Sequence, residues 1–367
     1  MDKGANMQGV LIKSILLALT LSIGALGAHA QTGDPSAMPH HPVVKSLRAI
    51  TPDELDIKLV NNIHYVASDE SHHHLFKKDI DGLGGAFIGI GTNQNYTMLP
   101  WAKPDLAIMM DFDQMVIDVH ELYRLAFLNA ETPKEFMQLW YARSKKTFRS
   151  LIKASCGDDK AKAKRLRKAY RYSRSRIVKA LKRTKKTQRK SRTNSYLGIQ
   201  SEYDYIVKMF KEDRIVFVRG DLTKNGAMKT MGEVLKKHGQ VVRVYHPSNA
   251  EQYFPYTQNY RNNVRSLPHD ARSKVVRTRA WAKFVELTPD EVLEMEQKLT
   301  DGKIKLKPNA PELRTPPKRK EIYYTYAVQT QADFLKWLGL EKTKSVRDML
   351  PYKSRVEYKR YEIGSPN

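Results

Sequence analysis

A glycine-rich turn and two carboxylates are the residues of this chain whose spacing could support ligand chemistry. Gly89 and Gly91 follow an apolar run and precede a predicted helix, and Asp111 ends the next apolar run. Such a turn lets a ligand approach the backbone, and a carboxylate at the next strand end can accept hydrogen bonds from ribose hydroxyls. Asp221, after a third apolar run, stands where a carboxylate could contact a base amino group. This order predicts a crevice for a nucleotide-like ligand.

A second polar group follows a later predicted strand, in the run His246-Pro247-Ser248-Asn249-Ala250-Glu251. His246 could be a general base, Asn249 a substrate anchor and Glu251 part of the site wall, which makes them the candidate catalytic residues. The alternative is a turn in which Pro247 and Asn249 serve the backbone geometry. The sequence leaves both interpretations open.

Three consecutive histidines, His72, His73 and His74, suggest a metal site together with His64 and His120. Adjacent residues on a helix point about 100° apart, so such a run cannot supply three ligands to one ion. One or two of them could join distant ligands. We expect a polar helix near the glycine turn and no metal.

The elements that position these residues alternate between strand and helix. Apolar runs predict strands over residues 85–90, 106–110, 214–218, 241–245, 274–279 and 322–328. Helices are predicted between them, with starts at Thr51-Pro52, Asp113, Thr132-Pro133 and Thr288-Pro289. The pattern predicts an α/β, Rossmann-like fold, with a mostly parallel sheet and helices on both faces. We expect this domain over residues 48–285 and a C-terminal α/β extension, residues 286–367, packing on it.

A basic helical hairpin interrupts this domain over residues 132–200. Between Arg143 and Arg192 there are 22 Lys and Arg against two acids, a net charge of +20 in a chain whose total is +25. The second helix, from about Lys160 to Gln188, has a thin apolar stripe of Leu166, Tyr170, Ile177 and Leu181. The segment could bind a polyanion, either nucleic acid or an anionic envelope polymer, or lie on an anionic membrane. A solvated charged hairpin is the remaining alternative.

The N-terminus has the pattern of an export signal. Lys3 and Lys13 precede an almost wholly apolar or small run over residues 14–27, and Ala28-His29-Ala30 is a small-x-small cleavage site. The pattern predicts a signal peptide over residues 1–30, a linker over 31–47, and a periplasmic or secreted mature protein without a transmembrane helix. An uncleaved anchor is the alternative, although the run is shorter than the ~20 residues of a spanning helix. The single cysteine, Cys156, excludes an intrachain disulfide.

The order of glycine turn, Asp111 and then Arg219-Gly220-Asp221 resembles the class I S-adenosylmethionine-dependent methyltransferase fold. The run from Gly89 to Tyr96, with Met110-Asp-Phe-Asp113 and Ser248-Asn-Ala-Glu251, resembles more narrowly a family of largely uncharacterised bacterial proteins with a methyltransferase-like Rossmann fold. That resemblance covers about residues 61–279 without the basic insert. It implies S-adenosylmethionine as cofactor, with Gly89 and Gly91 in the cofactor loop, Asp111 at the ribose and Asp221 at the adenine.

The chain departs from the methyltransferase pattern at three points. The acid usual before the first glycine is absent, Asn93 stands at the third glycine position, and the cofactor is cytoplasmic whereas this chain carries an export pattern. Asn93, Gln94 and Asn95 could contact a ligand or fill the cofactor space. Two functions follow: an enzyme transferring a methyl group to an unknown substrate, or a non-catalytic envelope or polyanion-binding protein. An open crevice favours the first, and a crevice filled by Asn93, Tyr96 or Trp101 favours the second.

Overall fold

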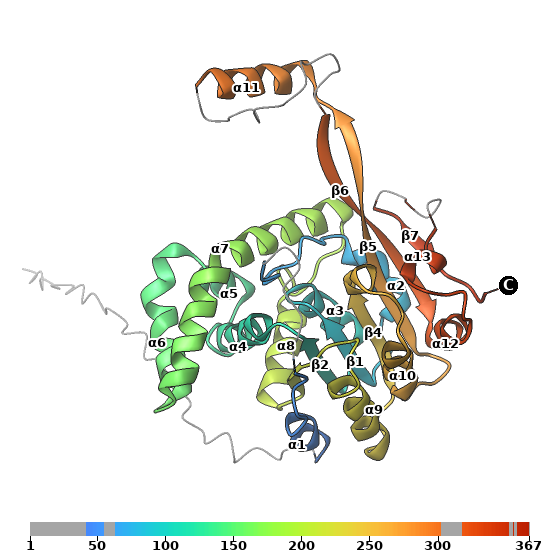
Figure 1. Cartoon of the computed structure of the whole chain (residues 1–367). Helices are drawn as coiled ribbons and strands as arrows, with labels where there is room; N and C mark the ends of the chain where they lie inside the picture. Colours follow the sequence, from blue (N-terminus) through green and yellow to red (C-terminus); the bar gives the residue numbers. More distant parts are fainter. Residues whose placement is uncertain (1–41, 55–62, 302–317, 352–354, 356–357, 367) are drawn as a thin grey trace, which may run out of the picture. The chain divides into compact units, whose positions relative to one another are not determined.

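The computed structural model describes residues 42–54, 63–301, 318–351, 355 and 358–366. Its centre is a seven-stranded sheet in the order β3-β2-β1-β4-β5-β6-β7. The strands are β1 (Ala86–Ile90), β2 (Leu106–Asp111), β3 (Ile215–Arg219), β4 (Val242–Ser248), β5 (Lys274–Glu286), β6 (Lys318–Thr330) and β7 (Arg360–Glu362). The first five strands of that order pair in parallel, β6 is antiparallel to β5, and β7 is parallel to β6. The predicted α/β, Rossmann-like sheet is confirmed (Figure 1).

Helices cover both faces of this sheet because the strands present apolar side chains alternately to each. In β1, Phe87 joins the cluster of one face and Ile88 that of the other. The first face carries α3 (Gln94–Ala102), α4 (Gln114–Leu128), α7 (Lys160–Ser191) and α8 (Gln200–Lys211). The second carries α1 (Pro42–Arg48), α9 (Ala227–Lys237), α10 (Gln258–Ser266), α12 (Gln331–Gly339) and α13 (Val346–Met349). The polar strand ends are left at the edge between these layers.

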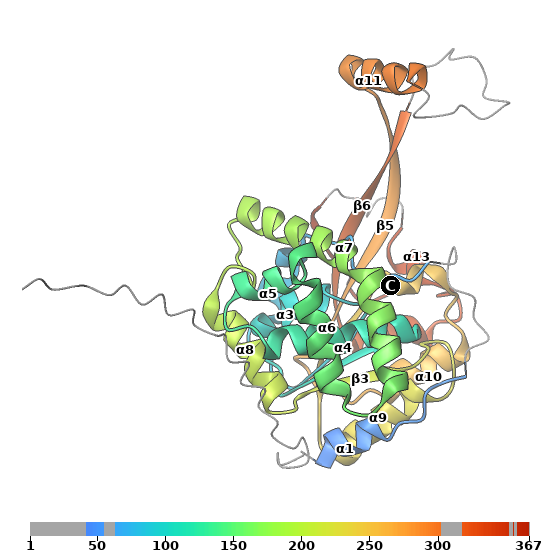
Figure 2. The same ribbon diagram turned by 90° about the vertical axis from the view of Figure 1, so that its left-hand side faces the viewer.

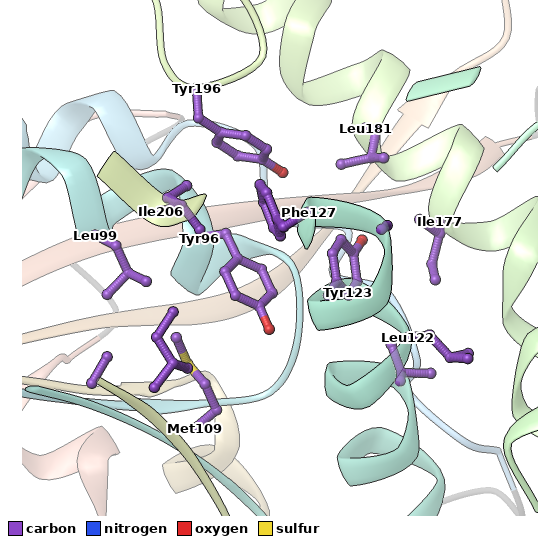
Figure 3. Packing of buried hydrophobic residues seen from close by; sticks show 14 of the residues in the cluster. Tyr96, Leu99, Met109, Leu122, Tyr123, Phe127, Ile177, Leu181, Tyr196 and Ile206 are labelled. Atoms are coloured by element: carbon purple, nitrogen blue, oxygen red, sulfur yellow. The ribbon is translucent and has the colours of Figure 1, made fainter. Parts of the chain in front are cut away.

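The helical insertion is part of the first layer. It comprises α5 (Pro133–Leu139), η4 (Ala142–Ser144), α6 (Lys145–Cys156) and α7. The predicted apolar stripe of α7 is confirmed, since its four residues are at most 2% exposed. Figure 3 shows Ile177 and Leu181 beside Leu122 and Tyr123 of α4. The cap predictions at Asp113 and Thr132 are confirmed, since Asp113 caps α4 and Thr132 forms a capping box at α5.

Two predictions at the N-terminal side were wrong. Residues 42–47, expected in a linker, belong to α1, whose Val43, Val44 and Leu47 are buried. Residues 51–54, expected to start a helix, are not helical, and Asp53 turns inward and accepts hydrogen bonds from buried backbone N–H groups of Asp221 and Ala227. The predicted signal peptide and most of the linker lie outside the described residues.

The C-terminal strands complete the same sheet. β6 and β7 extend it beyond β5, and β5 and β6 are longer than predicted, pairing from Lys274 and Thr330 to Glu286 and Lys318. Their far ends run past the other strands as a two-stranded ribbon that leads into α11 (Pro289–Thr300) (Figure 1). No helix in the described part of the chain combines the length and apolarity needed to cross a bilayer.

Candidate functional site

The carboxyl ends of β1 and β4 meet at the centre of the sheet. They are neighbouring parallel strands, and Gly89 lies opposite His246 in their register. β1 continues through the glycine turn into α3 on the first face, whereas β4 leads by way of η5 (Ala250–Tyr253) to α10 on the second. Ligands of open α/β sheets bind where connections diverge in this way. The two predicted polar groups therefore meet at one edge of the sheet, where β1 and β4 end. We call it the convergent edge.

Side chains of α3 fill the space over the glycine turn. A Cβ atom on Gly89 would lie 2.4 Å from Asn95 Oδ1, and one on Gly91 2.3 Å from Gln94 Nε2. Both amides donate to the carbonyl oxygen of Ile90 at 3.1 Å, and Gln94 Oε1 accepts from the N–H of Thr92 at 3.0 Å. The N–H of Thr92 and the carbonyl oxygen of Ile90, which would face a ligand in a cofactor loop, are therefore already hydrogen-bonded to side chains of α3.

The segment of residues 64–73, which leads into η3 (His73–Phe76), covers this turn, and we call it the covering segment. The N–H of Ser68 donates to Asn93 Oδ1 at 2.8 Å, and the carbonyl oxygen of Ser68 accepts from Arg183 of α7 at 2.6 Å. His64 Nδ1 lies 2.7 Å from Asp113 Oδ2. Asn93 is 2% exposed. Asn93 thus anchors the chain's own covering segment.

Tyr96 and Trp101 do not fill the crevice. Both belong to the buried cluster of the first face, and the Tyr96 hydroxyl lies 2.8 Å from His120 Nδ1. Nε2 of His120 lies 2.8 Å from the carbonyl oxygen of Gly91, so this histidine links α4 to the glycine turn. Burial lowers the pKa of His120 to about 4. The filling residues are Gln94 and Asn95, which the sequence placed in the same loop.

Asp111 ends β2 beside the turn and is partly exposed. Its Oδ1 accepts from the N–H of Asp113 at 2.9 Å. Burial raises the pKa of Asp111 to about 7, and the Asp113 carboxylate adds to this increase, whereas backbone N–H groups, including that of Gly91, act in the opposite direction. A carboxylate with this pKa carries its charge only part of the time near neutral pH.

The third acid, Asp221, serves the loop after β3. It is 5% exposed, and its Oδ1 accepts from the N–H and the hydroxyl of Thr223, both at 2.8 Å. Its own N–H donates to Asp53 Oδ2 at 2.9 Å. These contacts explain Asp221 as a residue that holds the turn between β3 and α9.

The candidates after β4 separate into different environments. His246 and Ser248, predicted to follow the strand, lie within β4 and are buried. Glu251 lies in the second layer, where its Oε2 is 2.7 Å from Arg277 Nε and its Oε1 accepts from the hydroxyls of Tyr256 and Tyr260 at 2.7 Å. These contacts indicate that Glu251 stabilises the packing of the second layer.

Asn249 remains at the end of β4 and is partly exposed. It is the residue before η5, and its carbonyl oxygen accepts from the N–H of Gln252 at 3.2 Å. Its side chain makes no capping hydrogen bond to η5. These contacts agree with the alternative in which Asn249 serves the backbone geometry of a turn.

His246 meets two residues that come from the covering segment. Ligand-capable atoms of Glu70, His73 and His246 all lie within 4.8 Å of one another, and the three residues are at most 3% exposed. His73 Nε2 is 3.3 Å from Glu70 Oε2, and His246 Nδ1 is 2.8 Å from Asn95 Oδ1. The histidine run pointed to His73, but no sequence signal joined it to Glu70 or to His246.

Residues 65–364 match a family model whose description is "Domain of unknown function (DUF7790)". The match begins within the covering segment and extends through β7, so it spans the sheet, the helical insertion and the convergent edge. No curated protein matches the chain.

Proposed function

We propose, from the premise that the chain belongs to the DUF7790 family, that it binds a linear polyanion through the outer face of α6 and α7. We call this face the basic face. In this proposal the protein keeps a methyltransferase-like fold without nucleotide chemistry at its glycine turn. One observation carries the proposal: of the 22 Lys and Arg between Arg143 and Arg192, none is buried and most are exposed.

The packing of α7 explains why its charges face outward. The stripe of Leu166, Tyr170, Ile177 and Leu181 is buried against the first face, so the cations occupy the remaining circumference. With 32 residues and a rise of ~1.5 Å per residue, α7 presents them over about 48 Å. Figure 2 looks onto α6 and α7, which lie in front of α4.

Few of these charges are neutralised by ion pairs in the part of the chain that the structure describes. Among ion pairs between described residues, α7 contributes one, from Arg165 Nε to Asp118 Oδ1 at 2.8 Å. Tyr172 and Tyr141 are already covered by the guanidinium groups of Arg176 and Arg143. Cations without free aromatic platforms favour contact with the charges of a polymer rather than stacking on bases.

The convergent edge supports the non-catalytic half of the proposal. The space over Gly89 and Gly91 holds Asn95 and Gln94, and Asn93 binds the covering segment. These contacts argue against S-adenosylmethionine at this turn. A thermal-shift measurement tests this directly, because a ligand in excess of its dissociation constant raises the melting temperature. We expect no shift with S-adenosylmethionine or its demethylated product.

Heparin and duplex DNA of mixed sequence serve as probes of the basic face. One variant replaces exposed cations of α7 by Gln: Lys164, Lys168, Arg171 and Lys179. A matched control replaces exposed lysines of other helices by Gln: Lys208, Lys211, Lys229 and Lys236. Fluorescence anisotropy across a salt series measures affinity and its salt dependence.

The α7 variant should bind DNA more weakly, and its logarithmic salt slope should fall by roughly three to four, about 0.9 per lost phosphate contact. The control should change both quantities much less. An equal effect of both variants would show that net charge alone is responsible, and would refute a defined binding face. Binding to heparin but not to DNA would assign the face to sulfated or carboxylated polymers.

A further inference from the structure

We propose that Glu70, His73 and His246 form a binding site for one divalent transition-metal ion, with Zn²⁺ as the first candidate. Two of these residues come from the segment that covers the glycine turn, and the third from β4. Their ligand-capable atoms lie within 4.8 Å of one another. The inference is independent of the polyanion proposal, since it uses no residue of the basic face.

The separations are close to those around a bound ion. With metal–ligand bonds of ~2.0–2.2 Å, two ligands in a tetrahedral site lie roughly 3.4 Å apart. The distance from His73 Nε2 to Glu70 Oε2 is 3.3 Å. The remaining separations, up to 4.8 Å, require small side-chain movements to close around the ion.

The hydrogen bonds of Asn95 prepare His246 as a ligand. Asn95 Nδ2 donates to the carbonyl oxygen of Ile90, so its Oδ1 faces His246 Nδ1 as an acceptor. Nδ1 must then carry the proton, which leaves the lone pair on Nε2 free in the neutral ring. This Nε2 is buried and has no hydrogen-bond partner among the described residues. A partner on the second ring nitrogen is the usual arrangement for a metal-binding histidine.

Glu70 is a buried carboxylate that needs a positive partner. It is 3% exposed, and the ion pairs between described residues give it one partner, His73. Its other oxygen accepts from the hydroxyl of Ser248, which is neutral. Burying a carboxylate without a full positive partner is unfavourable, and a divalent ion would offset that cost.

The surrounding residues hold the ligands in place. The hydroxyl of Tyr326, on β6, accepts from the N–H groups of Ser71 and His72 at 3.2 and 2.9 Å, and so fixes the chain between Glu70 and His73. Ser248 has a φ of +55°, which is uncommon for a residue with a side chain. Its hydroxyl donates to Glu70.

The donor set indicates the class of metal. Two imidazoles and one carboxylate suit Zn²⁺, Fe²⁺ or Co²⁺ better than Mg²⁺ or Ca²⁺, which prefer oxygen ligands. Three protein ligands leave a fourth position for water in a tetrahedral site.

Co²⁺ is a suitable probe, because tetrahedral coordination by nitrogen and oxygen produces visible absorption bands. The full chain is treated with a chelator, freed of it, and titrated with Co²⁺ and separately with Zn²⁺. We expect visible bands that saturate at one ion per chain, and a rise in melting temperature with Zn²⁺. A chain that binds neither ion at this stoichiometry would overturn the proposal and leave Glu70 and His73 as an ordinary buried pair.

Variants assign the ligands. His73→Gln and His246→Gln should abolish the saturable bands, whereas His72→Gln, which changes a neighbouring histidine outside the group, should keep them. Asn95→Leu should weaken binding about 10–100-fold, as loss of a partner to a ligand does. Circular dichroism of each variant without metal checks the fold. Folded His73→Gln and His246→Gln variants that still bind one ion would refute the assignment.

Discussion

Asp111 allows a test of how strongly the convergent edge disfavours a charged side chain. Its pKa rises from 3.8 to about 7. At roughly 1.4 kcal/mol per pKa unit this corresponds to about 4 kcal/mol against the charged form, an upper value that partial exposure reduces to about 2 kcal/mol. The replacement Asp111→Asn removes the charge and retains an oxygen that can accept from the N–H of Asp113. The variant should therefore be more stable than the parent chain at alkaline pH.

The sign of the pH dependence follows from proton binding. The native state holds a proton on Asp111 more firmly than the unfolded state does, so this residue's contribution to stability is fully present below pH ~4 and is lost as pH rises to about 7. Asn cannot ionise. The stability difference between variant and parent should be near zero at pH 4 and reach about 2 kcal/mol at pH 8.

Urea unfolding at a series of pH values measures this difference. Asp105→Asn is a matched control, because Asp105 lies just before the other end of β2 and is exposed. We expect that control to change stability by less than ~0.5 kcal/mol at every pH. A variant at Asp111 that is destabilised at pH 8, or whose difference is the same at pH 5 and pH 8, would refute the reasoning.

Two further predictions concern buried charges outside the edge. Glu251→Gln should destabilise the fold by about 3–5 kcal/mol, because it leaves Arg277 buried and uncompensated, and adding Arg277→Met should recover part of the loss in a double-mutant cycle. Additive losses would show that the pair is not coupled. Asp53→Ala should cost about 2–3 kcal/mol in urea unfolding, because the buried N–H groups of Asp221 and Ala227 each lose their acceptor. A loss below ~0.5 kcal/mol would mean that water replaces the carboxylate.

Local patterns were sufficient where the cause is local. Apolar runs predicted β1 and β2 because both faces of a parallel sheet are covered, and Asp113 was recognisable as a cap because capping involves neighbours in sequence. The stripe of α7 was readable for the same reason, since a helix must bury one side. The extent of β4 was not, because His246 and Pro247 read locally as a turn.

The chemistry of the edge depended on contacts between distant segments. Sequence alone placed the glycine turn and Asp111 at strand ends, because the alternation of strand and helix positions them there, whereas His246 lies inside β4 and not after it. Only the tertiary structure decided that Asn95 fills the turn and that Glu70 and His73 join His246. The physical reason is that side-chain rotamers and the path of a covering segment are set by packing, which no periodicity in the chain encodes.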